Sequence, residues 1–482
     1  MWAGNMLRWW GGVSRLTLIA SVSSLTLPLP SLAADITTQQ TVNSGGTLTV
    51  NAGDRVIANA DPAVALTGTG GSALITVNNS GTIQSTAAGA SRAIRFTNTG
   101  GGTTRNILIN NNAGAVIQTP GDAIQSQIDI TAGSITINNA GTIQSQGTGG
   151  SNGQAIDFGN IVTGVVNGIT INNLATGVMS SADSDAVRTG NNAILNNSGL
   201  IISNAATAGN NTDAVNVQNF TATVNNLTGG TISGSRHGIN IGTTGNVTVT
   251  NAAGGVILGR NGSGVGSDNI GTVTNFGRIT GTWNGVSANG DGDGIDVDNA
   301  ATITNAGIIE GTGASGFDSN GRANNSEGIS IGGGTIINSG SITGLSFAIV
   351  VNNDSVVSRS GVAATTLTNF GTITGQNGFA VRFENKLGDA RDNDTLVNHG
   401  TITGNGSIPD PTGIVLLQNG SVDGNSVGTL DGATFTGTGS ARFIRGDGSA
   451  IQMGEGVDTL PTSARSSATT AAPSTWRVAT TS

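Results

Sequence analysis

The chain has 482 residues, of which 78 are Gly and none is Cys or Tyr, and only 10% are charged. This composition excludes a disulfide framework and argues against a single compact globular core. The glycines follow no three-residue period, which excludes collagen, and 36% apolar residues argue against simple disorder. The formal net charge of −9 disfavours nucleic acid and anionic membranes as partners, because both attract basic surfaces.

Residues 1–34 have the features of a secretory signal peptide. Arg8 and Arg15 flank the start of an apolar stretch, and residues 31–34 (Ser-Leu-Ala-Ala) form a small-residue cleavage site. An uncleaved membrane anchor is the alternative, but hydroxyl residues and prolines leave too short an apolar run to span a bilayer. The sequence therefore predicts export, and removal of two arginines from a chain of charge −9 leaves −11.

Residues 35–75 contain weaker strand patterns at 46–50 and 64–66. We expect them to form an N-terminal cap and the first coils of a repetitive fold, because an open first coil would expose the edge of a sheet.

Residues 76–460 carry one repeated element, in which an alternating apolar strand is followed by Asn, a short spacer, Gly and a second strand with Ile or Val. Eleven steps over the 319 residues from Asn79 to Asn398 give a mean period of about 29 residues, typical of solenoids. Looser copies start at Asn112, Asn173, Asn226 and Asn251. The clearest turns pair Asn79 with Gly81, Asn139 with Gly141, Asn275 with Gly277, Asn305 with Gly307, Asn338 with Gly340, Asn369 with Gly371 and Asn398 with Gly400.

A third short strand lies between successive turns, as in Ala155-Ile156-Asp157-Phe158, with alternating apolar and polar residues. No repeat can bury its apolar face alone, so the repeats should stack. The predicted fold is all-β, a right-handed parallel β-helix (solenoid) of three-strand coils. Roughly fourteen coils would give a stack on the order of 70 Å long.

The residue types of the turn suggest a physical role. Gly and Asn tolerate positive φ, which a sharp turn between strands requires. Stacked Asn side chains should form a hydrogen-bonded ladder, by analogy with cross-β structures. The Ile residues after the turns, such as Ile83, Ile143 and Ile402, should stack inside as one column.

The repeat ends near Leu460, and residues 461–482 are rich in Ala, Ser and Thr with two prolines. This segment is predicted to be a disordered or frameshifted tail. Because such a tail would leave the last coil uncovered, the sequence is expected to be a fragment or to carry an altered end.

The repeat at residues 368–375, Thr-Asn-Phe-Gly-Thr-Ile-Thr-Gly, resembles those of the passenger domains of bacterial autotransporters, the type V secretion family. The resemblance covers residues 35–460 and implies a long β-helix outside the outer membrane; such passengers include adhesins, biofilm factors, proteases and esterases. The chain departs from the family in lacking the alternating strands and aromatic girdles of a translocator barrel. Outer-membrane association is implied only through that missing barrel, and a periplasmic location if it is truly absent.

Two short motifs are candidate sites. Residues 291–298 contain four Asp residues that could supply oxygen ligands to Ca²⁺, although a solvated loop before a strand is the favoured interpretation. Arg445-Gly446-Asp447 is the tripeptide that integrins recognise and is a possible cell-attachment motif, with Gly446 expected in a turn. Chance occurrence is the favoured interpretation, and no cofactor or metal is predicted.

Catalytic patterns are weak. His237 and His399 are the only histidines and lie far apart, and no serine lies on a nucleophile turn, so the chain is predicted not to be an enzyme. The enzyme alternative is a β-helical polysaccharide lyase or hydrolase. Its candidate residues are Asp157, Arg188, Arg382 and Glu384, with Lys386 as the only lysine.

These patterns favour a secreted or cell-surface protein that acts as an adhesin or surface-structure component. We expect such a protein to take part in cell adhesion and virulence. Its loops would contact a host or neighbouring cell through an unidentified saccharide or protein ligand, many weak contacts adding together. The other alternative is a truncated passenger without function.

Overall fold

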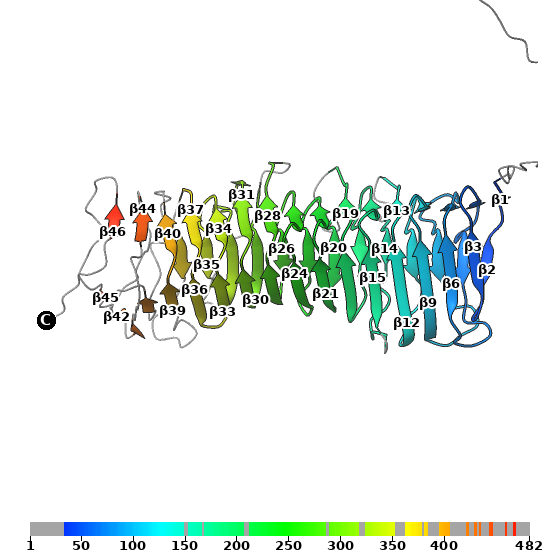
Figure 1. The fold of residues 1–482 in the computed structure, drawn as a ribbon, viewed down its shortest axis with the longest axis horizontal. Coiled ribbons are helices and arrows are strands. Elements are labelled where there is room, and N and C mark those ends of the chain that lie inside the picture. The colour runs from blue at the N-terminus through cyan, green and yellow to red at the C-terminus, as the bar shows by residue number, and fades with distance from the viewer. Residues whose placement is uncertain are drawn as a thin grey trace, which may run out of the picture. The chain divides into compact units, whose positions relative to one another are not determined.

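The computed structural model describes residues 33–404 except 149–152, 166–167, 207–211, 286–288, 318–322, 352–361, 378–379 and 384–394; beyond residue 404 it describes short strands only. The predicted signal peptide lies outside the described residues, apart from Ala33 and Ala34. The described part is an all-β parallel β-helix, so the predicted fold class is confirmed. Each coil adds one strand to each of three parallel stacks, and successive coils lie side by side in chain order (Figure 1).

The post-turn stack contains the strands that follow the Asn–Gly turn. Each strand pairs in parallel with its equivalents in the neighbouring coils. Its members are β1 (Asp35–Ile36), β4 (Arg55–Ala58), β7 (Thr82–Ser85), β10 (Val116–Thr119), β13 (Thr142–Ser145), β16 (Val178–Ser181), β19 (Leu200–Ser203), β22 (Thr231–Gly234), β25 (Val256–Gly259), β28 (Arg278–Thr282), β31 (Ile308–Thr312), β34 (Ser341–Gly344), β37 (Thr372–Gly375), β40 (Thr401–Gly404), β44 (Phe443–Gly446) and β46 (Ser466–Ala468).

The third-strand stack contains the strands of the Ala-Ile-x-Phe kind. Its members are β2 (Gln40–Val42), β5 (Val64–Leu66), β8 (Ile94–Phe96), β11 (Ile124–Ser126), β14 (Ile156–Asp157), β17 (Val187–Arg188), β20 (Val215–Gln218), β23 (Ile239–Ile241), β26 (Val265–Ser267), the first parts of β30 (Ile295–Asn305) and β33 (Ile329–Asn338), β35 (Ile349–Val351) and β38 (Val381–Phe383).

The pre-turn stack contains the strands that lead into the turn. Its members are β3 (Thr47–Val50), β6 (Ile75–Asn79), β9 (Thr104–Asn111), β12 (Ala132–Asn139), β15 (Ile169–Asn173), β18 (Ala193–Asn197), β21 (Thr221–Asn226), β24 (Asn246–Asn251), β27 (Ile270–Asn275), the second parts of β30 and β33, β36 (Thr365–Asn369), β39 (Thr395–Asn398) and β41 (Ser421–Asp423). In this stack β6 to β39 end at the turn Asn, whereas β3 ends at Val50 and β41 at Asp423.

The remaining strands pair antiparallel. β29 (Gly290–Asp291) pairs with β32 (Ala314–Ser315), and β42 (Thr429–Leu430) pairs with β43 (Ala433–Thr434) and β45 (Asp458–Thr459). Within residues 461–482 the structure describes β46 alone, which pairs in parallel with β44. At the other end, residues 35–75 supply β1 to β5 and the start of β6, which pair as ordinary coil strands.

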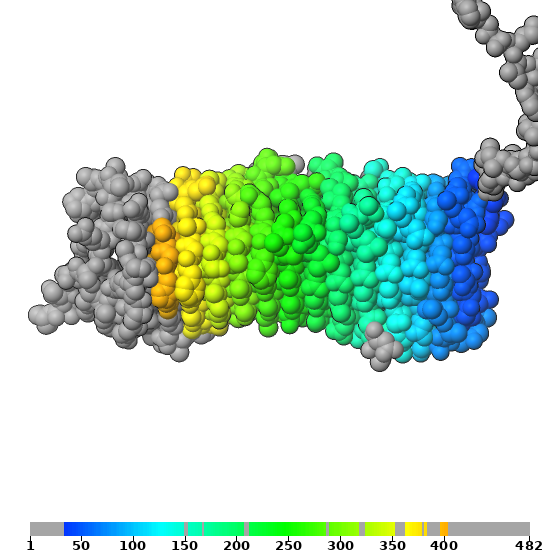
Figure 2. Space-filling view, in the orientation of Figure 1, coloured from blue at the N-terminus to red at the C-terminus, as the bar shows by residue number. Residues whose placement is uncertain are grey.

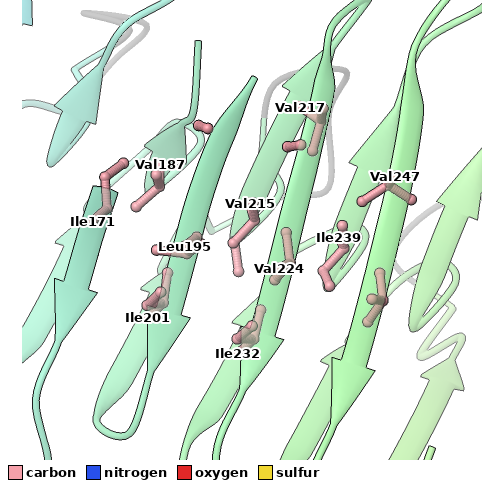
Figure 3. Packing of buried hydrophobic residues seen from close by; sticks show 14 of the residues in the cluster. Ile171, Val187, Leu195, Ile201, Val215, Val217, Val224, Ile232, Ile239 and Val247 are labelled. Atoms are coloured by element: carbon pink, nitrogen blue, oxygen red, sulfur yellow. The ribbon is translucent and has the colours of Figure 1, made fainter. Parts of the chain in front are cut away.

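The core is a column of β-branched residues enclosed by the three stacks. Alternation along each strand directs every second side chain inward, and strand register places Ile83, Ile143 and Ile402 in one column as predicted. All three are fully buried. Figure 3 shows Ile201 and Ile232 of the post-turn stack facing Leu195 and Val224 of the pre-turn stack. Stacking thus removes from water the apolar face that a single coil would expose.

The turn Asn residues form an unbroken buried ladder. In every link, Nδ2 of one Asn donates to Oδ1 of the Asn in the next coil at 2.8 Å. The ladder expected from the sequence is therefore present, with one correction, since Asn111 rather than Asn112 is the member in its coil. Its members are Asn79, Asn111, Asn139, Asn173, Asn197, Asn226, Asn251, Asn275, Asn305, Asn338, Asn369 and Asn398.

The turn glycines serve a different purpose from the one predicted. At Gly277 and Gly371 φ does not lie in the left-handed region. A Cβ on Gly371 would instead lie 2.0 Å from the carbonyl oxygen of Gly340 in the preceding coil. Gly is required here because the turns of successive coils stack in direct backbone contact. Positive φ occurs in the longer turns, for example at Gly114 and Gly254.

The coloured coils of Figure 2 pack into one continuous surface. The Asn corner is the connection between a pre-turn strand and the post-turn strand that follows it. Its length is nearly constant, with two residues (80–81) or four (112–115) between the strands. The corner between the post-turn and third-strand stacks varies much more, from three residues (37–39) to sixteen (313–328). Insertions are therefore concentrated away from the Asn ladder.

Candidate functional site

The strongest concentration of ionisable side chains lies where the third strand of each coil begins. We call this set the corner column; strand register aligns its members because each stands two residues before the first Ile or Val of its strand. All but Arg92 and His237 are buried. Its members are Arg92, Asp122, Gln154, Asp185, Asp213, His237, Ser263, Asp293 and Glu327.

Corner-column side chains accept hydrogen bonds from the backbone of the next coil. Asp185 Oδ1 accepts the N–H of Asp213 at 3.0 Å, and Asp213 Oδ1 accepts that of His237 at 3.2 Å. His237 Nδ1 accepts the N–H of Ser263 at 2.8 Å. The same contact joins Asp122 to the N–H of Gln154 at 3.1 Å and Asp293 to that of Glu327 at 2.7 Å. These acceptors satisfy backbone donors at a buried corner, which is a structural role.

Arginines neutralise part of this column. Arg236 binds Asp213 with both Nε and Nη2, at 2.9 and 2.8 Å, and Arg188 Nε lies 2.9 Å from Asp185 Oδ2. Desolvation and the neighbouring Asp213 raise the pKa of Asp185 to about 6. Desolvation also raises the pKa of Asp213, against the effect of Arg236. Desolvation of the ring and then the charge of Arg236 lower the pKa of His237, which agrees with a neutral ring whose Nδ1 is an acceptor.

The carboxylates are occupied by donors of the chain itself. Asp185 Oδ2 also accepts from Asn216 Nδ2 at 3.1 Å. Asp122 Oδ2 accepts from Gln125 Nε2 at 2.8 Å and from Arg92 Nε at 3.2 Å. Desolvation, and then Asp157, raise the pKa of Asp122 to about 6. A raised pKa can mark a catalytic acid, but here it accompanies saturated hydrogen bonding and burial, which favours a structural network.

The lyase candidates do not form one site. Asp157 and Arg188 are neighbours in register on β14 and β17, and Gln125 Nε2 lies 3.5 Å from Asp157 Oδ2. Arg382 lies on β38, several coils further along the stack, where its guanidinium carbon is 5.3 Å from the centre of the Phe347 ring. Glu384 and Lys386 lie outside the described residues. Arg382 therefore does not share a site with Asp157 and Arg188.

The acidic run at 291–298 is divided by the fold. Asp291 lies on β29, Asp296 and Asp298 lie on β30, and the buried Asp293 is hydrogen-bonded to Glu327 of the next coil. Among the residues that the structure describes, no group of three or more His, Cys, Asp or Glu side chains has an arrangement that could hold a metal ion.

The remaining candidates lie apart from one another. Arg445 and Gly446 end β44, with Gly446 in register with Gly404, so Gly446 is a strand residue and not the predicted turn; Asp447 lies outside the described residues. His399 occupies the variable turn position, stacked on Phe370 with ring centres 5.0 Å apart, and His237 belongs to a different corner.

Neither the structure nor similarity to known proteins assigns an activity to these residues. Within the described ranges, no helix is long and apolar enough to cross a membrane. The chain matches no family model, no curated protein and no solved structure.

Proposed function

We propose that the protein is an exported, non-catalytic β-helical passenger of the autotransporter type, which acts at the cell surface as an adhesin or surface-structure component. The observation that carries this proposal is the contrast between a constant Asn ladder and corner loops of very different length. A stack of this kind holds many loops at fixed spacing, so weak contacts with another surface can add together.

Two loops at the variable corner contact each other through described residues. β29 and β32 join the loops of two successive coils, and Trp283 Nε1 donates to Ser315 Oγ at 2.7 Å. Phe317, in the second of these loops, is 60% exposed. Exposed aromatic residues are typical of contact surfaces. Asp122, Asp185 and Asp213 of the corner column are hydrogen-bonded to donors of the chain itself, which favours a structural role for them over catalysis.

Deletion of the gene should reduce attachment of the producing cell, and the wild-type gene should restore it. A second complementing gene lacking residues 314–325 should restore less attachment. This deletion leaves Gly313, Ser326, Glu327 and Gly328 as the connection, the same length as 235–238, and Ser326 Oγ already donates to the carbonyl oxygen of Gly313.

Circular dichroism and thermal unfolding of the purified shortened protein should match those of the wild type. Unchanged attachment of the deletion strain, or full restoration by the shortened gene, would contradict loop display. Release of reducing ends from polysaccharides by the purified protein would favour the lyase or hydrolase alternative instead.

A further inference from the structure

A shallow groove crosses three successive coils beside the Asn ladder. It has a volume of about 360 Å³, with Val256, Phe276, Arg278 and Ile308 as its side chains and glycines between them. Phe276 is 50% exposed and Ile308 is 40% exposed. Binding sites for small ligands are of this kind, mostly apolar with a few polar groups.

The floor of the groove is backbone that no side chain can fill. A Cβ on Gly277 would lie 2.3 Å from the carbonyl oxygen of Gly255, and a Cβ on Gly307 would lie 2.1 Å from that of Gly277. The direct contact between turns therefore keeps the floor flat.

The ring of Phe276 has small neighbours in the turn column. Ala252 and Ala306 occupy the equivalent turn positions of the two adjacent coils. Phe370 has the same turn position in a later coil, but its ring is stacked on His399 with an angle of 12° between the ring planes. The ring of Phe276 is thus available as a platform for a ligand with a flat apolar face.

Arg278 is the one charged residue of the groove lining, and an ion pair with Glu310, a neighbour of the lining, balances its charge. Arg278 Nη2 is paired with Glu310 Oε2 of the next coil, and Arg278 Nε donates to Thr280 Oγ1 at 3.1 Å. The Arg278 side chain is 48% exposed and that of Glu310 is 22% exposed. An anionic ligand would meet Glu310 and a cationic one would meet Arg278, whereas hydroxyl groups can donate to one and accept from the other.

We propose that this groove binds one pyranose ring of an uncharged saccharide, with Phe276 stacking on the apolar face of the sugar and the Arg278–Glu310 pair bonding its hydroxyls. A pyranose combines a flat C–H face with hydroxyl edges, which is the combination that the groove offers. The proposal rests on the proposed adhesive function and names a ligand class for it.

The test is binding of the full-length purified protein to an array of neutral and acidic glycans, with apolar peptides spotted beside them. The wild type should bind neutral glycans selectively. Phe276→Ala should weaken this binding about tenfold, the loss expected for one aromatic contact. Glu310→Gln should weaken it too, and the matched variant Phe370→Ala should bind within about twofold of the wild type. Because Phe276 is half exposed, its truncation should leave thermal unfolding unchanged.

Absence of neutral-glycan binding, equal binding by Phe276→Ala, or preference for acidic glycans or apolar peptides would overturn the proposal. Cell attachment tests the adhesive function separately from the groove. If cells expressing Phe276→Ala attach as the wild type does, while cells expressing the variant lacking residues 314–325 do not, the groove is excluded as the attachment site and loop display remains supported.

Discussion

Replacing Asn197 with Ala should lower the free energy of unfolding by about 4 kcal/mol, because it breaks the buried ladder in the middle of the stack. Asn197 Nδ2 donates to Asn226 Oδ1 at 2.8 Å and to the carbonyl oxygen of Thr231 at 3.1 Å. Its Oδ1 accepts from Asn173 Nδ2 at 2.8 Å and from the N–H of Gly199 at 3.2 Å. Each buried polar group left without a partner costs about 1–3 kcal/mol.

The adjacent residue offers a matched control. Asn196 belongs to a second ladder on the outward face, where its Nδ2 donates to Asn172 Oδ1 at 2.9 Å and its Oδ1 accepts from Asn225 Nδ2 at 2.9 Å. Because these groups are partly exposed, water can replace the lost bonds, and Asn196→Ala should cost less than about 1 kcal/mol. The measurement is denaturant unfolding of both variants, with hydrogen exchange over residues 173–231. Similar losses for the two variants would contradict a structural role specific to the buried ladder.

Raising the pH from 5 to 8 should destabilise the protein, and Glu327→Gln should remove a large part of that effect. Glu327 and Asp293 are hydrogen-bonded carboxyl groups of successive coils at the corner column. Desolvation raises the pKa of Glu327 from 4.5 to about 7. Desolvation, and then the charge of Glu327, raise the pKa of Asp293. Asp291 opposes ionisation of both groups, and Arg382 favours ionisation of Glu327.

The direction of the effect follows from proton linkage. The pKa of Glu327 is higher in the folded state than in the unfolded chain. Its contribution to the free energy of unfolding is therefore fully present below pH 4.5 and is lost as the pH rises through about 7. A shift of this size corresponds to about 3 kcal/mol. The raised pKa values of Asp122 and Asp185 act in the same direction, whereas the lowered pKa of His237 acts in the opposite direction and offsets part of the effect.

The measurement is the free energy of unfolding at pH 5 and at pH 8. Between pH 5 and pH 8, the free energy of unfolding of Glu327→Gln should fall by about 3 kcal/mol less than that of the wild type. Glu310→Gln, which changes an outward carboxylate paired with Arg278, should retain the pH dependence of the wild type. An unchanged pH dependence in Glu327→Gln would show that the buried pair does not hold the proton.

The repeat pattern predicted the fold because the same physical demands recur in every coil. Inward Ile residues at period two and Asn at each turn are visible in the sequence, since each must be present in almost every copy. Asn111 was misplaced by one residue because Asn110, Asn111 and Asn112 are consecutive, and only strand register shows which one enters the ladder.

Features that depend on contacts between coils were harder to predict. The need for Gly371 comes from the backbone of Gly340, about one repeat earlier in the chain, and no local rule reports that distance. The corner column had a usable signal, an acidic residue before Ala or Gly and then Ile or Val, as at Asp185 and Asp293. Asp157 and Arg382 do not lie close together, because residues on equivalent strands are close only when their coils are neighbours.

The most direct test of the account is the location of the protein in the producing cell. Intact cells should be labelled with an antibody against residues 35–404 and treated with external protease, with a periplasmic protein as the internal control. The account predicts labelling and proteolysis at the surface, or recovery from the medium, while the control stays protected. Protection of the protein together with the periplasmic control would contradict a surface role.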